Sequence, residues 1–291
     1  MPRPARSASS FGAAGLVFGG LICQEVGAGI AVTLFPQVGA IGMVALRLTF
    51  SAIILFAVFR TSLRHRTRRD WMTVVAFGVA LAVMNSVFYL ALTRLHLGAA
   101  VTIEYLGPLV LSVVVARRAS AWLWAVLALG GVVLLGRGGF DALDPLGVVF
   151  ALAAGVAWVI YILLSARTGA RFARLDGLAI AMAVGAIVII PFGVASAGVA
   201  LVHPMVLLVG LGVAILSSAI PYGLELIALR RLPASTFSIL LSLAPALAAV
   251  AGLVILHQQL EILDVVAIGL VVVASMGAVR AAGGRRIGPQ V

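Results

Sequence analysis

The chain contains successive runs of about 20 apolar residues, separated only by short polar segments. A segment of that length crosses hydrocarbon as a helix, because a helix pairs its backbone N–H and C=O groups internally. The runs that fit are 11–34, 40–59, 71–93, 97–116, 119–136, 144–166, 177–197, 204–229, 234–256 and 262–280. The sequence therefore predicts an all-α polytopic membrane protein with ten transmembrane helices and no soluble domain.

Composition excludes a water-soluble protein. Hydrophobic residues make up 63% of the 291 residues and charged residues only 10%, whereas a soluble domain has about 25% charged residues. The first apolar run follows Arg3 and Arg6. It is longer than the hydrophobic part of a signal peptide, about 7–15 residues, so we interpret it as the first spanning helix.

The arginines predict the orientation. All 20 basic residues are arginine, and with a cytoplasmic N-terminus 17 of them fall on the cytoplasmic side. Only Arg94 and Arg137 fall outside, and Arg47 lies within a span. This bias predicts that both termini are cytoplasmic. Because the arginines occupy short loops, the net charge of +11 indicates contact with membrane lipids and not with nucleic acid.

Two segments resemble each other at a constant offset of 137 residues: TRLHLGAAVTIEYLGPLV at 93–110 and RRLPASTFSILLSLAPAL at 230–247. The aligned pairs are Arg94 with Arg231, Leu95 with Leu232 and Pro108 with Pro245. The offset predicts a first five-helix repeat at 1–140 and a second at 141–291. An odd number of helices inverts the second repeat. Inverted repeats are typical of secondary transporters, which bind substrate near the membrane midplane.

Four polar side chains fall at a similar depth in the first four predicted spans: Glu25, Arg47, Asn85 and Glu104. A charge at the centre of a span costs about 2.5–3.5 kcal/mol, so such residues pair or face a cavity. An amino-acid zwitterion needs a cation such as Arg47 for its carboxylate, and Glu104 or Glu25 for its ammonium. In the alternative, Arg47 forms a structural ion pair with Glu104, or neutralises both glutamates.

Two prolines release backbone carbonyls beside polar residues. Pro108 cannot donate to the carbonyl of Glu104, and Pro221 cannot donate to that of Ser217. In a membrane, loosened backbone is tolerated where it lines a cavity or finds protein partners. Both places are therefore candidates for a polar site within the membrane.

Aromatic residues and one further glutamate complete the candidate set. Tyr89 lies one turn from Asn85, and Trp158 and Tyr161 share a helical face, as do Tyr222 and Glu225. Packing or interfacial anchoring is the alternative for the aromatic residues, and pairing near the arginines for the glutamate. The candidate substrate-binding residues are Arg47, Glu104, Glu25, Asn85, Tyr89, Tyr105, Trp158, Tyr161, Tyr222 and Glu225.

The chain resembles the EamA-type drug/metabolite transporter superfamily and, within it, the bacterial inner-membrane exporters of threonine and homoserine. The resemblance rests on LFPQVGAIGMVALRL (34–48), NSVFYLALTRLHLGAAVTIEYLGPL (85–109), VAWVIYIL (156–163), AILSSAIPYGLELIALRRLPASTF (214–237) and SLAPALAAVAG (242–252). It implies ten helices in two inverted repeats and proton-coupled export of threonine, homoserine or similar amino acids by alternating access. The alternatives are another metabolite or drug as cargo, or a membrane scaffold without transport activity.

One position departs from the family pattern. The family usually has a Gly-Glu pair after the ninth span, where this chain has His257 and Gln258. We interpret the family's glutamate as a residue that caps a loop; in the alternative, it serves coupling.

The sequence predicts neither an enzyme nor a cofactor. It has no GxxxxGK[ST] phosphate loop, no HExxH or other metal-binding spacing and no nucleophile elbow. The one cysteine, Cys23, cannot form a disulfide framework or a metal cluster.

Overall fold

The computed structural model describes residues 7–61, 63, 66–116, 119–136, 143–172, 175–229, 232 and 234–282. Within these residues the regular structure is entirely helical. The α-helices are α1 (Ser7–Thr33), α2 (Phe35–Phe59), α3 (Arg68–Leu92), α4 (Leu97–Glu104), α5 (Leu106–Ala116), α6 (Ala119–Leu135), α7 (Pro145–Gly169), α8 (Asp176–Ala197), α9 (Pro204–Ala214), α10 (Ile220–Leu229), α11 (Ala234–Leu241), α12 (Ala244–Leu256) and α13 (Ile262–Ala282). A 3₁₀-helix, η1 (Gly198–Val202), follows α8, and a π-helix, η2 (Ile215–Ala219), joins α9 to α10.

Among the described residues, nine helical segments are long and apolar enough to cross a membrane. They coincide with nine of the predicted spans and confirm the prediction of a polytopic membrane protein. The remaining predicted span, 119–136, corresponds to α6. The apolar part of α6, Trp122–Leu135, is shorter than the other nine segments.

Caps and prolines set the beginnings of several helices. At α3, the side chain of Thr67 accepts a hydrogen bond from the N–H of Asp70, whose carboxylate accepts one from the N–H of Thr67. At α7, Asp144 caps the helix and Pro145 occupies its first turn. The second predicted span begins earlier than expected, at Phe35. Gly39, with φ 66°, kinks the helix there.

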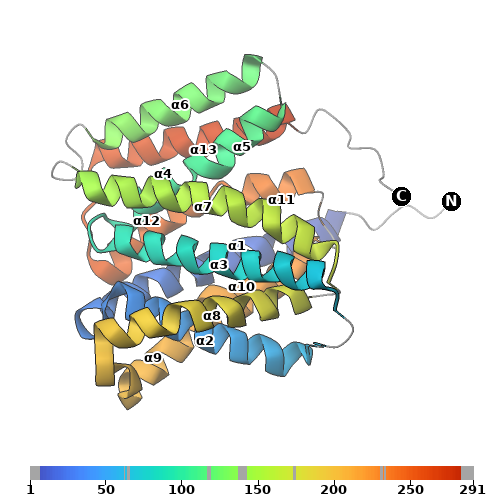
Figure 1. Cartoon of the computed structure of the whole chain (residues 1–291). Helices are drawn as coiled ribbons and strands as arrows, with labels where there is room; N and C mark the ends of the chain where they lie inside the picture. The colour runs from blue at the N-terminus through green and yellow to red at the C-terminus, as the bar shows by residue number, and fades with distance from the viewer. Residues whose placement is uncertain are drawn as a thin grey trace.

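The helices lie side by side, with α5, α6 and α13 along one edge and α2, α8 and α9 along the other (Figure 1). We call the end near the starts of α3 and α8 the basic end. It holds two ion pairs between segments distant in sequence, Arg66–Asp176 at 3.2 Å and Arg171–Asp70 at 3.1 Å.

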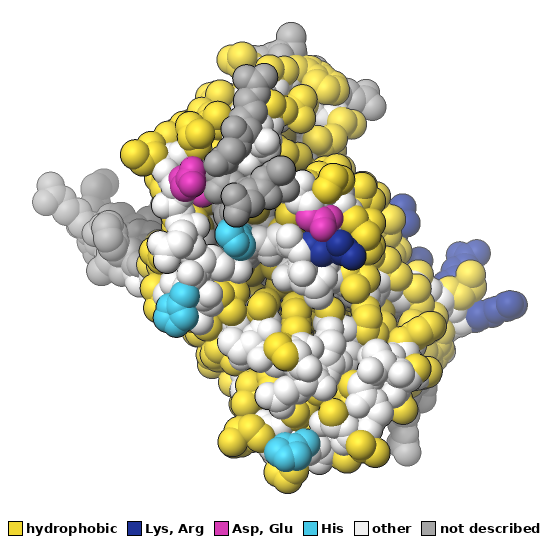
Figure 2. Space-filling view, turned by 90° about the vertical axis from the view of Figure 1, so that its left-hand side faces the viewer, with side chains coloured by type: hydrophobic (Ala, Val, Ile, Leu, Met, Phe, Trp, Pro, Cys, Tyr) yellow, Lys and Arg dark blue, Asp and Glu magenta, His cyan; other side chains and the backbone are white. Residues whose placement is uncertain are grey.

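The opposite end carries the connections 93–96, 198–203 and 257–261. Figure 2 shows that this face is mainly hydrophobic or uncharged, with histidines scattered over it. Among the described residues its one ion pair joins Arg94 to Asp144 at 2.8 Å. The described structure thus separates a basic end from a nearly uncharged one, as the arginine distribution in the sequence suggested.

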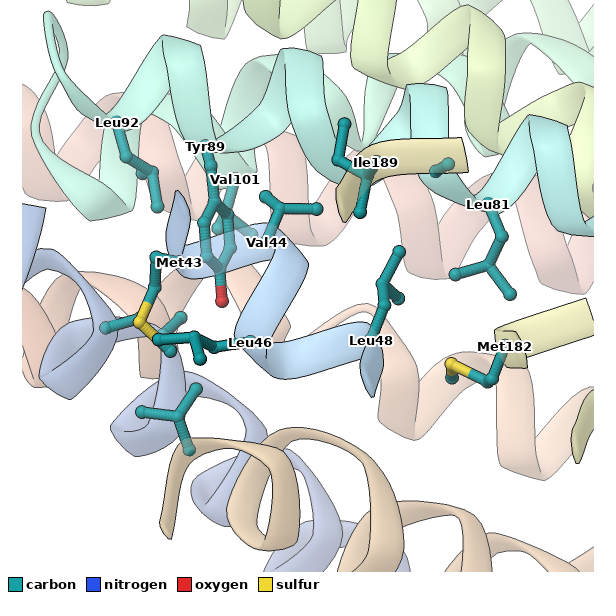
Figure 3. Packing of buried hydrophobic residues seen from close by; sticks show 14 of the residues in the cluster. Met43, Val44, Leu46, Leu48, Leu81, Tyr89, Leu92, Val101, Met182 and Ile189 are labelled. Carbon is teal, nitrogen blue, oxygen red and sulfur yellow. The ribbon is translucent and has the colours of Figure 1, made fainter. Parts of the chain in front are cut away.

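The apolar core on the α2 side depends on close approach between helices. Leu48, Leu81, Met182 and Ile189 meet where α2, α3 and α8 pack together (Figure 3). Gly78 allows the contact, because a Cβ atom at that position would lie 2.6 Å from the carbonyl oxygen of Ala181 on α8. Small residues at such crossings are typical of membrane helices, where association depends on van der Waals packing.

Candidate functional site

A cavity of about 450 Å³ lies within the helical bundle, and we call it the central cavity. Its lining comes from α1, α2, α3, α4, α5, α7, α10, α11 and α13, and from the turn between α4 and α5. Nine of the ten predicted site residues line it: Glu25, Arg47, Asn85, Glu104, Tyr105, Trp158, Tyr161, Tyr222 and Glu225. The lining also includes polar residues that were not predicted, namely Gln24, Ser112, Ser238, Ser242 and Ser275. The structure therefore brings together predicted site residues that are up to 200 positions apart in the sequence.

Arg47 on α2 is held by two neutral groups. Its Nη1 donates to the hydroxyl of Tyr89 and its Nη2 donates to the carbonyl of Ser217, both at 3.3 Å. Its Nε is buried and has no hydrogen-bond partner within the described structure. Among described residues, no N···O distance of 4.0 Å or less joins Arg47 to Glu25 or Glu104. The structure therefore does not contain the ion pair that the sequence left open as an alternative.

The Ser217 carbonyl can accept a hydrogen bond from Arg47 because of Pro221. Since proline has no N–H, it cannot pair with the carbonyl of Ser217 as an α-helix would require. The chain forms the π-helix η2 at this point, and the Ser217 carbonyl accepts the Arg47 guanidinium. π-Bulges of this kind occur often at functional sites. The released carbonyl was predicted from the sequence, but its partner was not.

Glu104 lies where a transmembrane helix is interrupted. It is the last residue of α4, Tyr105 forms a turn and α5 begins at Leu106. Its carbonyl oxygen lies against α7, since a Cβ atom on Gly155 would be 2.7 Å from it. Glu104 is only 8% exposed and lines the central cavity, so its carboxylate lies within the protein beside that space.

A second interruption separates α11, which ends at Leu241, from α12, which begins at Ala244. Ser242 forms part of the turn and lies 137 residues after Tyr105, the offset found between the two similar sequence segments. Pro108 and Pro245 occupy the same place relative to the two breaks.

Glu25 and Asn85 are buried in the wall of the central cavity. The Nδ2 of Asn85 donates to the carbonyl of Leu81 in its own helix at 2.8 Å. The side-chain carbonyl of Asn85 therefore remains as the group that can accept a hydrogen bond from a cationic ligand.

Aromatic rings complete the wall and support the arginine. Tyr105 and Trp158 meet edge to face with ring centroids 4.8 Å apart. Tyr89 does not line the cavity; it is fully buried and its ring packs on Phe35. Figure 3 shows its hydroxyl directed from α3 toward α2. Tyr89, predicted as a lining residue, instead supports Arg47 from behind the cavity wall.

The bundle is tightly packed at the opposite end. Gln258 accepts a hydrogen bond at 3.0 Å from the N–H of Leu97, the first residue of α4. The next residue, Gly98, contacts α12, where an added Cβ atom would lie 2.8 Å from that of Ala249. Gln258 thus caps a helix distant in sequence, in agreement with the capping interpretation of this position. The lining of the central cavity extends the other way, to Val279 near the basic end.

Asp144 has two roles at the same end. One carboxylate oxygen accepts the backbone N–H groups of Leu146 and Gly147, and the other accepts Arg94. The N–H of Gly147, with the guanidinium of Arg94, holds the pKa of Asp144 below its usual value. The start of α7 is thereby tied to the segment that precedes α4.

Long apolar helices around a cavity with buried charges define a polytopic membrane protein with a polar site inside the membrane. The sequence model of the EamA-like transporter family matches residues 145–280. The Escherichia coli K12 threonine/homoserine exporter RhtA is 42% identical over 253 residues, covering 86% of this chain and 85% of that protein. The Salmonella typhimurium LT2 RhtA is 40% identical over 255 residues, covering 87% and 86%.

The chain belongs to the EamA-like transporter family. Its relatives are transporters, which confirms the prediction that it is not an enzyme. A solved crystal structure of another protein shares the fold with a TM-score of 0.64 at 20% identity, covering 94% of this chain and 97% of that one.

Proposed function

We propose that the protein is a secondary active exporter of threonine, homoserine or similar small amino acids, which it exchanges for protons across the bacterial plasma membrane. The names of its relatives support the cargo. The observation that carries the proposal is the arrangement around Arg47, whose described partners are neutral although three carboxylates, those of Glu25, Glu104 and Glu225, line the same cavity. Charges within a membrane that do not pair with one another are suited to an external ligand of both signs.

In the proposed complex, the cargo carboxylate lies against Arg47. Tyr89 and the Ser217 carbonyl hold the guanidinium, and its Nε has no partner in the described structure. The ammonium group of the cargo lies against Glu104 or Glu25, which approach the cavity from α4 and α1. Hydrogen bonds between ionised groups are roughly twice as strong as neutral ones. The site therefore favours zwitterions over neutral solutes.

Transport proceeds by alternating access in this proposal. The two inverted repeats at 1–140 and 141–291 rock against each other around the central cavity, with α6 as the fifth of ten membrane helices. The two helix breaks separated by 137 residues support the repeat. With both termini cytoplasmic, the basic end faces the cytoplasm. The cavity, whose lining extends toward that end, then has the inward-facing form.

Proton coupling follows if Glu104 binds either the cargo ammonium or a proton, but not both together. The carboxylate releases its proton inward when it accepts the ammonium, and takes up another from the outside after the cargo has left. Each cycle exports one zwitterion and imports at least one proton. Glu104 is suited to this exchange because it is buried at a helix break and lines the central cavity.

Proteoliposomes test the proposal. Wild-type protein in inverted vesicles should accumulate labelled threonine when the vesicle interior is acidic, and Glu104→Gln should abolish that accumulation. Glu261→Gln is the matched control, because Glu261 is exposed at the start of α13 and does not line the central cavity. Full proton-driven accumulation by Glu104→Gln would overturn the coupling assignment. Absence of transport of any amino acid by the wild type would favour a scaffold.

A further inference from the structure

A second cavity, of about 240 Å³, adjoins the central cavity and lies between α3, α7, α8 and α10. We call it the side cavity. Its polar lining consists of Tyr161, Ser165, Thr168, Tyr222 and Glu225. Tyr161, Tyr222 and Glu225 also line the central cavity, so the two spaces share one wall.

The side cavity extends from the shared wall toward the basic end. Along η2 and α10, Glu225 is eight residues beyond Ser217, whose carbonyl binds Arg47, and this spacing is about 12 Å at 1.5 Å per residue. Along α7, Thr168 is ten residues beyond Trp158, which is about 15 Å. Gly177 and Leu178 at the start of α8 complete this end of the lining. Glu225, which lines both cavities, therefore lies about two helical turns closer to the basic end than Ser217, whose carbonyl binds Arg47.

The lining has an anionic interior and a basic rim. Glu225 is the one charged side chain among the described lining residues. No ion pair joins it to an arginine within the described structure. Arg230, the partner considered from the sequence, lies outside the described residues. At the rim, the guanidinium of Arg66, which is paired with Asp176, lies over the ring of the lining residue Phe172, with its carbon 4.5 Å from the ring centroid.

A second, independent observation points to a ligand. Thr168 is 2% exposed, and its hydroxyl oxygen is buried without a hydrogen-bond partner in the described structure. A buried polar atom without a partner is unfavourable, so such groups often mark a ligand or water position. A carboxylate, four hydroxyl groups and a basic rim together fit a small molecule with an ammonium group at one end and a carboxylate at the other.

We infer that the side cavity is a second amino-acid site, in which Glu225 holds the cargo ammonium group before the cargo reaches the central cavity. This inference rests on the proposed function and deepens it. The cargo occupies the side cavity with its ammonium group inward and its carboxylate toward the basic rim. It then passes the shared wall formed by Tyr161 and Tyr222. The site serves cargo that arrives from the basic end and not cargo that arrives from the opposite end.

The asymmetry between the two faces provides the test. The KM for threonine is measured in inverted vesicles, where the basic end faces the assay medium, and in right-side-out vesicles, where the opposite end does. Glu225→Gln should raise KM about tenfold in inverted vesicles, the effect of one lost hydrogen bond between charged groups. The rise in KM should be smaller in right-side-out vesicles, where the cargo arrives from the opposite end. Glu225→Asp should restore part of the loss, and Glu261→Gln should behave as wild type.

Two results would overturn the side cavity as a separate site. An equal rise in KM from both faces would place Glu225 in the central site and overturn the side cavity as a separate site. An unchanged KM in inverted vesicles would overturn it too. In both cases the wild type still transports threonine, so the proposed function stands. Failure of the wild type to transport any amino acid would refute the proposed function and the side site together.

Discussion

The contact between Gly107 and Gly155 is the closest approach of the interrupted helix to α7, and it allows a quantitative prediction. A Cβ atom on Gly107 would lie 2.1 Å from the carbonyl oxygen of Gly155, whereas Cβ atoms in folded proteins keep at least 3.0 Å from such atoms. The obstacle is backbone and cannot rotate away. Gly107→Ala therefore forces the start of α5 and α7 apart by about 1 Å.

Overpacking of this kind costs about 1–3 kcal/mol. Alanine recovers up to about 1 kcal/mol through its higher helix propensity. Gly107→Ala should therefore lower the free energy of unfolding by about 1–2 kcal/mol. Because the Glu104 carbonyl also lies against Gly155, the same change should displace the carboxylate and raise the KM for threonine.

Denaturant titration of the purified protein in detergent measures the stability, and proteoliposome uptake measures the KM. Gly212→Ala is the control, since no atom lies within 4 Å of the Cβ position at Gly212 in α9. It should leave stability unchanged or raise it. The double variant Gly107→Ala/Gly155→Ala should cost less than the sum of the single changes, because both changes force the same two helices apart. Wild-type stability of Gly107→Ala would refute the close approach of the two helices.

Three further changes test other parts of the structure. Tyr89→Phe removes one of the two described acceptors of Arg47 and should raise the KM for threonine about threefold in proteoliposomes. Gln258→Leu leaves the N–H of Leu97 without its acceptor and should lower stability in detergent by about 1–3 kcal/mol. Gln258→Glu should not lower it, because an anion at a helix N-terminus is favourable. The pKa of Asp144 is lowered in the folded protein. Its stabilising effect is therefore fully present above the pKa of the unfolded state and is lost as pH falls through the folded-state pKa. Between pH 6 and about 3, the melting temperature of Asp144→Asn should fall less steeply than that of the wild type.

Elements and local backbone features could be predicted from the sequence because they depend on local chemistry. Apolar length alone located the membrane helices, and the arginines indicated which ends lie together. Pro108 and Pro221 marked the helix break after Glu104 and the π-helix at Ser217. Similar depth along the helices placed Arg47 and the two glutamates in one layer.

The partners of these groups could not be predicted, since they depend on how the helices face one another. Arg47 reaches a carbonyl 170 residues away, and no periodicity specifies that pairing. Gln258 was noted as a departure from a family pattern, yet only the packed structure shows which helix it caps. Gly107 carried a usable signal as a small residue beside Pro108, whereas nothing local marked Gly155 as its partner.

Pro221 has a consequence for Arg47 that extends across the two halves of the chain. Because residue 221 is a proline, an α-helix in this segment cannot supply an N–H donor to the Ser217 carbonyl. An arginine has five N–H donors in a fixed fork, and Arg47 uses one of its Nη2 donors to bind the carbonyl of Ser217. The donors that remain for an anion are therefore determined by a proline 174 positions away. A change at position 221 would therefore alter the donors that Arg47 can offer to an anion, although the two residues lie in different halves of the chain.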